Sequence, residues 1–563
     1  MANKKIIVIG GSSAGPKAAA RARRLDQNAE ITMFQKGPDL SMASCGFPYY
    51  VGGVFDERNK LLNTPTGVVR DPKFYWNAKG IKAVINTEIT RIDRENKRVE
   101  YINHQTGESG QQEYDKLIIA TGATPNMPPV PGINLEGITT LQSMQDADYL
   151  RNIRDEGKIK KAVVIGGGLI GIETLEALHL AGIELTLVEL FPQLLSFLDW
   201  DMAKLIENYL KTKANVITQN GVAEFIGTNG KLEAVKLQNG TQIPCELAVV
   251  AIGVKPNIKL AREAGIEIGQ LGGILVNQHM QTNDPDIYAA GDCCEIPNLI
   301  TGKNVLAPYG DLANLEGRVA GENMIMGNTA KFPGTIQTGI CKLFDYGAGI
   351  TGLSEIKAKE AGFDFEVAVN ASFDKPKFMG GQLLITKLIA EKNTGQLLGA
   401  QCLGPGEVSK QLAIWATAIK AKQTVEDIVC SDLPYAPPFS MAVDHSIATS
   451  HVMENKMRRF FKGINGPQLK EKLDNGDAMF ILDTRGPDEY ENMRLGIGET
   501  LIPVGMLRKR VEDLPQDKNT EIITYCQISL RGYEAAMFLQ GLGYKNVKVL
   551  EGGVAAWPYP KEK

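Results

Sequence analysis

The sequence has no long apolar run and no large excess of charge of either sign. No uninterrupted apolar stretch approaches the ~18–20 residues that a transmembrane helix needs. The 61 Lys and Arg residues nearly balance the 65 Asp and Glu residues, which gives a net charge of −4. A nucleic-acid binder usually carries a basic domain or stripe instead. We therefore expect neither a membrane-spanning protein nor a nucleic-acid partner.

Cysteine is also scarce, with eight residues among 563. The apolar run that follows the first five residues is too short for the core of a signal peptide. We therefore expect a cytoplasmic protein whose cysteines are mostly reduced, including the adjacent Cys293 and Cys294. No histidine lies in a metal-ligand constellation, so we predict no metal site. At about 150 residues per domain, the length allows roughly three to four domains.

Two Gly-rich turns each lie between a predicted strand and a predicted helix. The first turn, GGSSAG at 10–15, follows an apolar strand over 5–9 and precedes a helix over 16–25 and a strand over 30–34. The second, GGGLIG at 166–171, follows a strand over 162–165 and precedes a helix to about 181 and a strand over 184–189. Such units place a phosphate at the helix N-terminus. Two in this context are much stronger evidence than one.

The second turn satisfies the G-x-G-x-x-G pattern with Gly166, Gly168 and Gly171. Glu189 ends the next strand, where a carboxylate accepts hydrogen bonds from a ribose 2′-hydroxyl. A carboxylate there would repel the 2′-phosphate of NADPH. The second unit is therefore predicted to bind NADH, and we also assign Glu173 to this cofactor site.

The first turn departs from the pattern, because Ser12 replaces the middle glycine and Gln35 stands where the ribose carboxylate usually is. Two later segments support a dinucleotide site here. The segment ATGA at 120–123 follows a buried strand over 116–119, and IYAAGD at 287–292 ends another strand.

These four elements in this order resemble the pyridine nucleotide-disulfide oxidoreductase family over residues 1 to about 450. The resemblance implies FAD in the first site, NADH in the second and a homodimer. The domains implied are FAD-binding (1–150 and 254–330), NAD-binding (151–253) and dimerisation (331–451). The residues assigned to FAD are Gly10, Ser12, Ala14, Gly15, Gln35, Lys36, Thr121, Gly122, Gly291 and Asp292, the last placed to bond the flavin ribitol or the pyrophosphate.

Cys45 decides the branch of the family, because no second cysteine follows it at the C-x-x-x-x-C spacing of glutathione reductases. Residues 41–49, SMASCGFPY, resemble the active-site segment of coenzyme A disulfide reductases. A lone cysteine beside a flavin can carry a mixed disulfide, a persulfide or a sulfenic acid. We expect the site, together with charge transfer to oxidised flavin, to lower its pKa. The resemblance also assigns coenzyme A contacts to Arg24, Ser41 and Ser44, and a guanidinium suits phosphates.

Single-cysteine NADH oxidases and peroxidases resemble the chain equally in fold, but they carry a His where Ser13 stands. Tyr435 matches a tyrosine that, in coenzyme A disulfide reductases, reaches across the dimer toward the partner's cysteine. It would act as a proton donor or a positioning hydroxyl. A second tyrosine of those reductases is absent near 377–380, KFMG. That departure favours a sulfur species other than coenzyme A disulfide.

Residues 463–563 resemble a single rhodanese domain, with LDTR at 482–485 and CQISLRG at 526–532. The second segment follows a predicted strand and precedes a helix, so its backbone N–H groups would form an anion cradle. Only four residues separate Cys526 from Arg531, against five in cysteine phosphatases, so we predict sulfur transfer. The basic segment 455–466 is interpreted as a solvated linker that could span up to ~40 Å.

The combined prediction is an α/β protein with two Rossmann-like, glutathione reductase-like domains, an α+β dimerisation domain and an α/β rhodanese domain. It would use FAD and NADH to reduce small-molecule persulfides or disulfides, namely coenzyme A persulfide, coenzyme A disulfide or polysulfide. The catalytic residues would be Cys45, Tyr435, Cys526 and Arg531. Two alternatives remain open. One is an NADH oxidase or peroxidase using a Cys45 sulfenic acid, and the other is a sulfur-trafficking or redox-sensing protein.

Overall fold

The computed structural model describes residues 3–563. The chain forms two compact units: one comprises Met1–Leu190 and Ile217–Thr335, the other Phe191–Val216 and Ile336–Lys563. Across the described range, no helix combines the length and the apolar character needed to cross a membrane.

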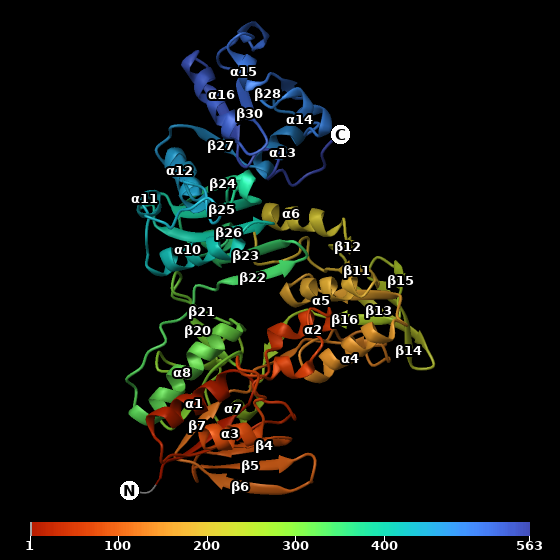
Figure 1. Cartoon of the computed structure of the whole chain (residues 1–563), viewed down its shortest axis with the longest axis vertical. Coiled ribbons are helices and arrows are strands. Elements are labelled where there is room, and N and C mark those ends of the chain that lie inside the picture. The colour runs from red at the N-terminus through yellow and green to blue at the C-terminus, as the bar shows by residue number, and fades with distance from the viewer. Residues whose placement is uncertain (1–2) are drawn as a thin grey trace. The chain divides into compact units, whose positions relative to one another are not determined.

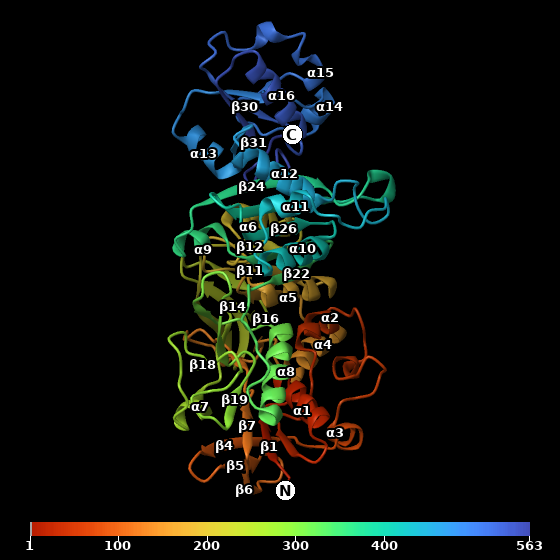
Figure 2. The same ribbon diagram turned by 90° about the vertical axis from the view of Figure 1, so that its left-hand side faces the viewer.

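The first unit contains a parallel sheet in the order β19-β7-β1-β2-β3, as predicted for a dinucleotide-binding domain. Helix α8 lies against helix α1 beside this sheet (Figures 1 and 2). The two helices approach closely, since a Cβ added to Gly317 would lie 2.3 Å from the Ala14 carbonyl oxygen. The elements are β1 (Lys5–Ile9), α1 (Ala14–Leu25), β2 (Glu30–Phe34), β3 (Ile81–Val84), β7 (Lys116–Ile119), β19 (Ile287–Ala289) and α8 (Gly310–Met326).

A second parallel arrangement in the first unit runs β11-β10-β16-β9. Its elements are β9 (Ile138–Thr139), α4 (Met144–Glu156), β10 (Lys161–Ile165), α5 (Leu169–Leu180), β11 (Glu184–Val188) and β16 (Leu247–Val250). The unit also contains two three-stranded antiparallel sheets: β4 (Thr87–Asp93), β5 (Arg98–Asn103) and β6 (Ser109–Glu113), and β13 (Val222–Thr228), β14 (Lys231–Leu237) and β15 (Gln242–Pro244). The predicted βαβ units are therefore both present.

The second unit begins with an antiparallel sheet in the order β22-β23-β26-β25-β24, with α10 and α12 packed against it. The elements are β22 (Gly339–Leu343), β23 (Tyr346–Gly352), β24 (Phe365–Phe373), β25 (Leu383–Glu391), β26 (Leu397–Gly404), α10 (Val408–Lys420), α11 (Val425–Val429) and α12 (His445–Met457). Helix α6 (Trp200–Leu210), which the sequence had placed within 151–253, belongs to this unit. The fully buried Lys387 holds it, with Nζ 2.6 Å from the Asp201 carboxylate.

The C-terminal part of the second unit is a parallel sheet in the order β27-β31-β30-β28-β29. Its elements are β27 (Lys462–Ile464), α13 (Gly466–Asp474), β28 (Phe480–Asp483), α14 (Pro487–Asn492), β29 (Thr500–Leu501), α15 (Val504–Leu507), β30 (Glu521–Tyr525), α16 (Leu530–Gly541) and β31 (Asn546–Leu550). This α/β sheet confirms the fold class predicted for the last hundred residues.

The segment 455–466 is not the solvated linker that its basic composition suggested. Helix α12 runs through Met457, and β27 begins at Lys462. Lys456 is largely buried, with Nζ 2.6 Å from the buried Glu551 carboxylate. Burial opposes its charge, but Glu551 and Glu366 outweigh burial and raise the pKa of Lys456. The prediction of solvated basic side chains was therefore wrong for Lys456, which meets buried carboxylates from distant parts of the chain, whereas Arg458, Arg459 and Lys462 are exposed.

Candidate functional site

The two Gly-rich turns need glycine for the same steric reason. Gly10 has φ +111°, and a Cβ there would lie 2.1 Å from the Ala120 carbonyl oxygen. Gly166 has φ +107°, and its Cβ would lie 2.3 Å from the Ala251 carbonyl oxygen. Only glycine combines this backbone region with so close an approach. Each turn is thereby held tightly against a neighbouring parallel strand.

In each βαβ unit, the residue that follows the second strand accepts a hydrogen bond from a backbone N–H of the Gly-rich turn. The Gln35 amide oxygen accepts a hydrogen bond from the Gly11 N–H at 2.8 Å, and the Glu189 carboxylate accepts one from the Gly167 N–H at 2.6 Å. A Cβ on Gly168 would meet no atom within 4 Å, so the backbone there leaves open space at the N-terminus of α5. These residues fit a dinucleotide, with Glu189 beside the ribose.

Asp292 follows β19, whose pairing with β7 brings it to the sheet edge where the first turn lies. Burial raises the pKa of this carboxyl group. Within residues 3–563, no other residue donates a hydrogen bond to its side chain, which leaves the carboxylate able to accept hydroxyl donors of a ribitol. The neighbouring Gly291 N–H donates to the buried Glu316 carboxylate at 2.6 Å. Burial raises the pKa of Glu316 to about 8. Glu316 was not singled out from the sequence, because only the tertiary contact with the Gly291 N–H, remote along the chain, marks it.

The other residues assigned to FAD lie around the same edge, with two differences. Thr121 donates its hydroxyl to the Asn257 carbonyl at 2.7 Å and is thereby part of the scaffold. Lys36 is exposed and pairs with Glu88 at 3.0 Å, so its ammonium is held outside the turn.

Cys45 lies in a short 3₁₀ turn, Ser44–Gly46, immediately before α2 (Phe47–Val51). The cysteine is free and the residue is exposed, but surrounding atoms partly enclose its sulfur. A Cβ added to Gly310, the first residue of α8, would lie 3.8 Å from the Cys45 sulfur. The fold thus brings the thiol to the N-terminus of a long helix that is remote in sequence.

The side chains around Cys45 raise its pKa. Burial of the thiol is the largest cause, followed by the carboxylates of Glu173, Asp292 and Asp311. The prediction that the site lowers this pKa was therefore wrong for the protein's own side chains. The segment 41–49 contains no charged residue, and the carboxylates arrive from α5, from the residues after β19 and from α8. Tyr49, which sequence reasoning did not single out, donates its hydroxyl to Glu173 at 3.4 Å.

The three residues assigned to coenzyme A differ in environment. Arg24 is exposed near the end of α1 and close to Lys79. Burial, and then the like charge of Arg24, lower the pKa of Lys79. Ser41 is buried and its hydroxyl is hydrogen-bonded to the Tyr75 hydroxyl, whereas Ser44 is exposed beside Cys45. Arg24 and Lys79 form a pair of cations suited to phosphate groups.

Tyr435 lies in the second unit, between α11 and α12, and its side chain is 55% exposed. The far end of this segment is anchored by Lys410, whose ammonium lies 2.7 Å from the buried Asp444 carboxylate. Lys410 also donates to the Phe439 carbonyl at 3.4 Å. The segment is thus fixed at its base while Tyr435 projects from it.

Cys526 follows β30 and is almost fully buried. Its carbonyl accepts a hydrogen bond from the Val554 N–H at 3.0 Å, which ties the cysteine loop to the segment after β31. The Arg531 guanidinium donates two hydrogen bonds, of 2.7 Å each, to the two carboxylate oxygens of Glu489. That pairing lowers the pKa of Glu489 to about 2 and raises that of Arg531, to which Cys526 also contributes. The structure therefore brings Cys526 and Arg531 together, as predicted.

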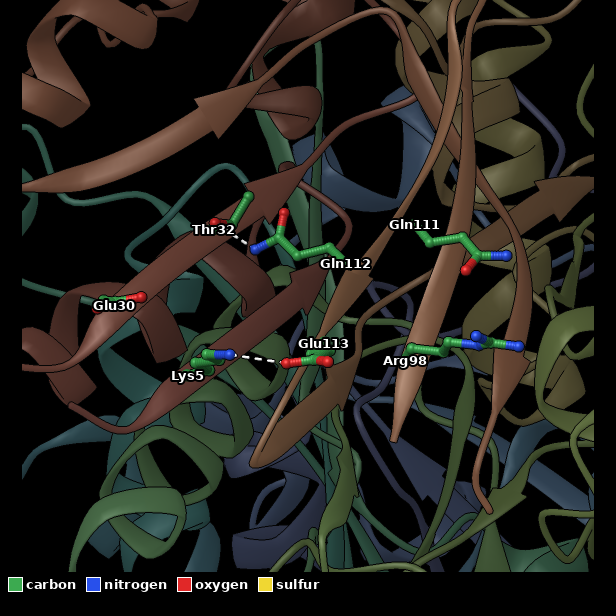
Figure 3. A pocket seen from close by; sticks show the side chains of 7 residues that line it. All are labelled: Lys5, Glu30, Thr32, Arg98, Gln111, Gln112 and Glu113. Atoms are coloured by element: carbon green, nitrogen blue, oxygen red, sulfur yellow. Dashed lines mark hydrogen bonds and ion pairs between the residues drawn. The ribbon is translucent and has the colours of Figure 1, made fainter. Parts of the chain in front are cut away.

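A polar cavity of about 460 Å³ lies at the N-terminal ends of β1 and β2 in the first sheet (Figure 3). Lys5 and Glu30, the first residues of β1 and β2, line it, and Lys5 pairs with Glu113 at 2.8 Å. The dinucleotide turn follows the other end of β1, so this cavity is separate from the site. Among residues 3–563, no group of three or more His, Cys, Asp or Glu side chains could hold a metal ion.

Three family models match the chain. The pyridine nucleotide-disulphide oxidoreductase model covers residues 4–303, the dimerisation domain of the same family covers 338–447, and a rhodanese-like domain covers 466–558.

Two solved structures resemble nearly the whole chain, and a curated relative resembles most of it. The chain is similar to a NAD-dependent persulfide reductase from A. fulgidus, with a TM-score of 0.93, 40% identity, and coverage of 98% of this chain and 100% of that one. It is also similar to reduced Bacillus anthracis CoADR-RHD, with a TM-score of 0.91, 34% identity, and coverage of 99% and 98%. A curated relative, the NAD(P)H coenzyme A polysulfide/persulfide reductase of Pyrococcus horikoshii, is 34% identical over 80% of this chain and 98% of its own length.

Proposed function

We propose, from the premise that this chain belongs to the pyridine nucleotide-disulfide oxidoreductase family and carries a C-terminal rhodanese-like domain, that it reduces small-molecule persulfides and disulfides with NADH. The observation that carries this proposal is a free, exposed thiol without a partner cysteine, Cys45, beside the Asp292 edge of the first dinucleotide site. The substrates would be coenzyme A persulfide, coenzyme A disulfide and polysulfide.

The Cys45 thiolate would attack a sulfur of the substrate. With a persulfide R–S–SH, one new bond forms at Cys45 while the substrate S–S bond breaks. Either hydrosulfide leaves and a mixed disulfide with R remains, or the thiolate of R leaves and a Cys45 persulfide remains. FAD held at the first dinucleotide site would supply two electrons from NADH. With them the sulfur–sulfur bond on Cys45 would break and Cys45 would return to its thiolate. The thiol or sulfide that is released takes up the proton.

Two features of the chain support the choice of cofactor and substrate. Glu189, hydrogen-bonded to the Gly167 N–H, presents a carboxylate that favours NADH over NADPH. Arg24 and Lys79 offer adjacent cations for the phosphates of coenzyme A, and Ser44 lies beside the reacting thiol. All eight cysteines are free, which suits the reducing cytoplasm that we expect for this protein.

The protein would work as a homodimer, in line with its match to the dimerisation domain. In that assembly Tyr435 would approach the Cys45 thiol of the partner subunit and donate or position a proton. Its high exposure within one chain, together with that of Phe439 (71%) and Phe378 (80%), supports this assignment. The rhodanese-like domain would receive sulfane sulfur on Cys526 and pass it to the thiol of coenzyme A.

The test is anaerobic NADH oxidation by the FAD-loaded protein with each of the three substrates, with sulfide measured in parallel. Rapid turnover of coenzyme A persulfide with one sulfide released per NADH is the expected result. Slow anaerobic turnover followed by rapid NADH loss in air would instead establish an oxidase that uses a Cys45 sulfenic acid. Slow turnover with every acceptor, together with a stable persulfide on Cys526, would establish a sulfur carrier or redox sensor.

A further inference from the structure

A cavity of about 600 Å³ lies between α15 and α16 in the rhodanese-like domain, where Figures 1 and 2 both show these helices side by side. Its volume is in the range of small-molecule sites, roughly 300–1,000 Å³. The lining residues are Val504, Leu507, Arg508, Tyr533, Glu534, Ala535, Met537 and Phe538. The mechanism described above uses none of them.

One wall of the cavity is formed by α16, the helix that follows the cysteine loop. Tyr533, Glu534, Met537 and Phe538 share one face of α16, and Leu530 at the start of that helix extends the same face by the i, i+3, i+4 spacing. Leu530 is 61% exposed and belongs to the loop-to-helix segment that begins at Cys526. At 1.5 Å per residue, Leu530 and Phe538 are about 12 Å apart along the helix. A ligand in the cavity would therefore need a flexible arm to bring a thiol to Cys526.

The wall and rim of the cavity have the chemistry of a nucleotide site. The Arg508 guanidinium lies over the Phe538 ring, 4.4 Å from its centroid, and Tyr533 adds a second aromatic ring. Aromatic rings and guanidinium planes are surfaces on which bases stack. Glu534 offers an acceptor for an exocyclic amine. Arg508 and Lys509 are exposed and form no ion pair with any residue of the described chain 3–563, so both cations can meet phosphates.

We infer that this cavity binds the nucleotide end of coenzyme A when its thiol accepts sulfur from Cys526. The inference rests on the proposed function, in which coenzyme A accepts sulfur from Cys526, and it assigns a site to the nucleotide of that acceptor. In the transfer, the coenzyme A thiolate attacks the outer sulfur of the Cys526 persulfide. A bond forms between these two sulfurs, and the bond between the outer sulfur and the Cys526 sulfur breaks. Its electron pair remains on Cys526 as a thiolate, so the step involves no net oxidation or reduction.

The test measures sulfur transfer from thiosulfate by the FAD-loaded full chain carrying Cys45→Ser, in which the reductase chemistry is silent. The acceptors are coenzyme A, pantetheine, which has the same thiol arm without the nucleotide, and cyanide. The expected result is a kcat/KM for coenzyme A about fivefold to tenfold above that for pantetheine, as expected for two exposed charge contacts. This preference should shrink as salt rises toward 1 M, where charges are screened within ~3 Å.

Arg508→Ala should lower the coenzyme A rate toward the pantetheine rate and leave cyanide unchanged. Arg510→Ala is the matched control, because it removes the same charge from a neighbouring residue that pairs with Asp513 outside the cavity. Equal rates for coenzyme A and pantetheine in the parent chain, at low and high salt, would overturn the inference without needing any variant to fold. If Arg508→Ala lowered the rate with cyanide as much as the rate with coenzyme A, the inference would also be overturned. Arg508 would then support the Cys526 loop and not a nucleotide.

Failure of the proposed function has a different signature, namely NADH-dependent reduction that survives in Cys45→Ser. The transfer assay contains no NADH, so the two outcomes are independent.

Discussion

Cys45 and Cys526 are two thiols of one chain in opposite surroundings. Cys45 is exposed, and burial together with Glu173, Asp292 and Asp311 raises its pKa. Cys526 is buried in a backbone loop, and the cation Arg531 lies close to it. The charged side chains around the first thiol are carboxylates that oppose its anion, whereas a cation, Arg531, lies beside the second.

The difference indicates which thiolate depends on a cofactor for its stabilisation and which depends on the protein. A thiolate that must exchange electrons with a bound flavin can be stabilised by that flavin. The side chains around such a thiolate can therefore be acidic. A thiolate that only carries sulfur has no such partner, and the chain must stabilise the anion through its own groups.

The largest expected effect separates the two thiols by activity. Cys45→Ser should lower NADH-linked reduction of coenzyme A disulfide by more than about 1,000-fold, because removal of a nucleophile eliminates the covalent route. It should leave thiosulfate–cyanide sulfur transfer intact, and Cys526→Ser should give the reverse pattern. Steady-state rates of both reactions for both variants check this. A single variant that abolishes both activities would show that the two thiols work as one site.

The next effect concerns the support of the Cys526 loop. Lys456→Met leaves the buried Glu551 carboxylate without its cation, and removal of one partner of a buried pair typically costs about 3–5 kcal/mol. The Val369 N–H also donates to Glu551 at 2.8 Å, so the loss should loosen the joint between β24 and the segment after β31. Denaturant unfolding followed with sulfur-transfer assays measures this. Lys462→Met, which removes an exposed charge nearby, is the control, and equal destabilisation by both would contradict the assignment.

A smaller effect is expected at Arg531. Arg531→Ala should slow sulfur transfer by about 10–100-fold, the value of a lost hydrogen bond to a charged group. Arg531→Lys keeps the charge but loses the two-pronged grip on Glu489, so it should recover only part of the rate. Rates with thiosulfate and cyanide decide the point. Wild-type transfer in Arg531→Ala would mean that the backbone cradle alone stabilises the Cys526 anion.

The smallest effect sharpens the electrostatic contrast at Cys45. The Glu173 carboxylate raises the pKa of Cys45, so Glu173→Gln should lower that pKa. At any pH below the pKa, the fraction of Cys45 present as thiolate should then rise, and alkylation should become faster at that pH. The pH profile of Cys45 alkylation, followed by mass spectrometry in the FAD-loaded protein, measures this. Glu263→Gln, an exposed change on another helix, should leave the profile in place, and an unchanged profile in Glu173→Gln would contradict the contrast.

Much of the fold was predictable because its signals are local. Strands β1 and β7 are continuous apolar runs, and their predicted bounds match the structure. Helix α1 starts two residues before its predicted start at Pro16, since the turn enters the helix directly and proline is tolerated in the first helical turn. The pairing of Cys526 with Arg531 was also predictable, because one loop carries both residues.

The errors occurred where distant segments meet. The charge around Cys45 comes from α5, from the residues after β19 and from α8, which no window around the cysteine contains. Lys456 resembled a linker residue until the fold buried it against Glu551. Lys387 similarly joins α6 to the second unit, a contact between distant segments that the strand sequence around this lysine does not reveal.

The sequence by itself determined the chemistry available to this protein: the two dinucleotide turns, the lone thiol, the sulfur-carrying loop and the family to which they point. These features are encoded in short stretches, where steric limits on glycine and the spacing of residues in a turn act within a few positions. The tertiary structure alone decided the electrostatics of Cys45 and the burial of Lys456 against Glu551. Coulomb interactions and desolvation depend on distances in space, and the groups that meet at these two places are distant along the chain.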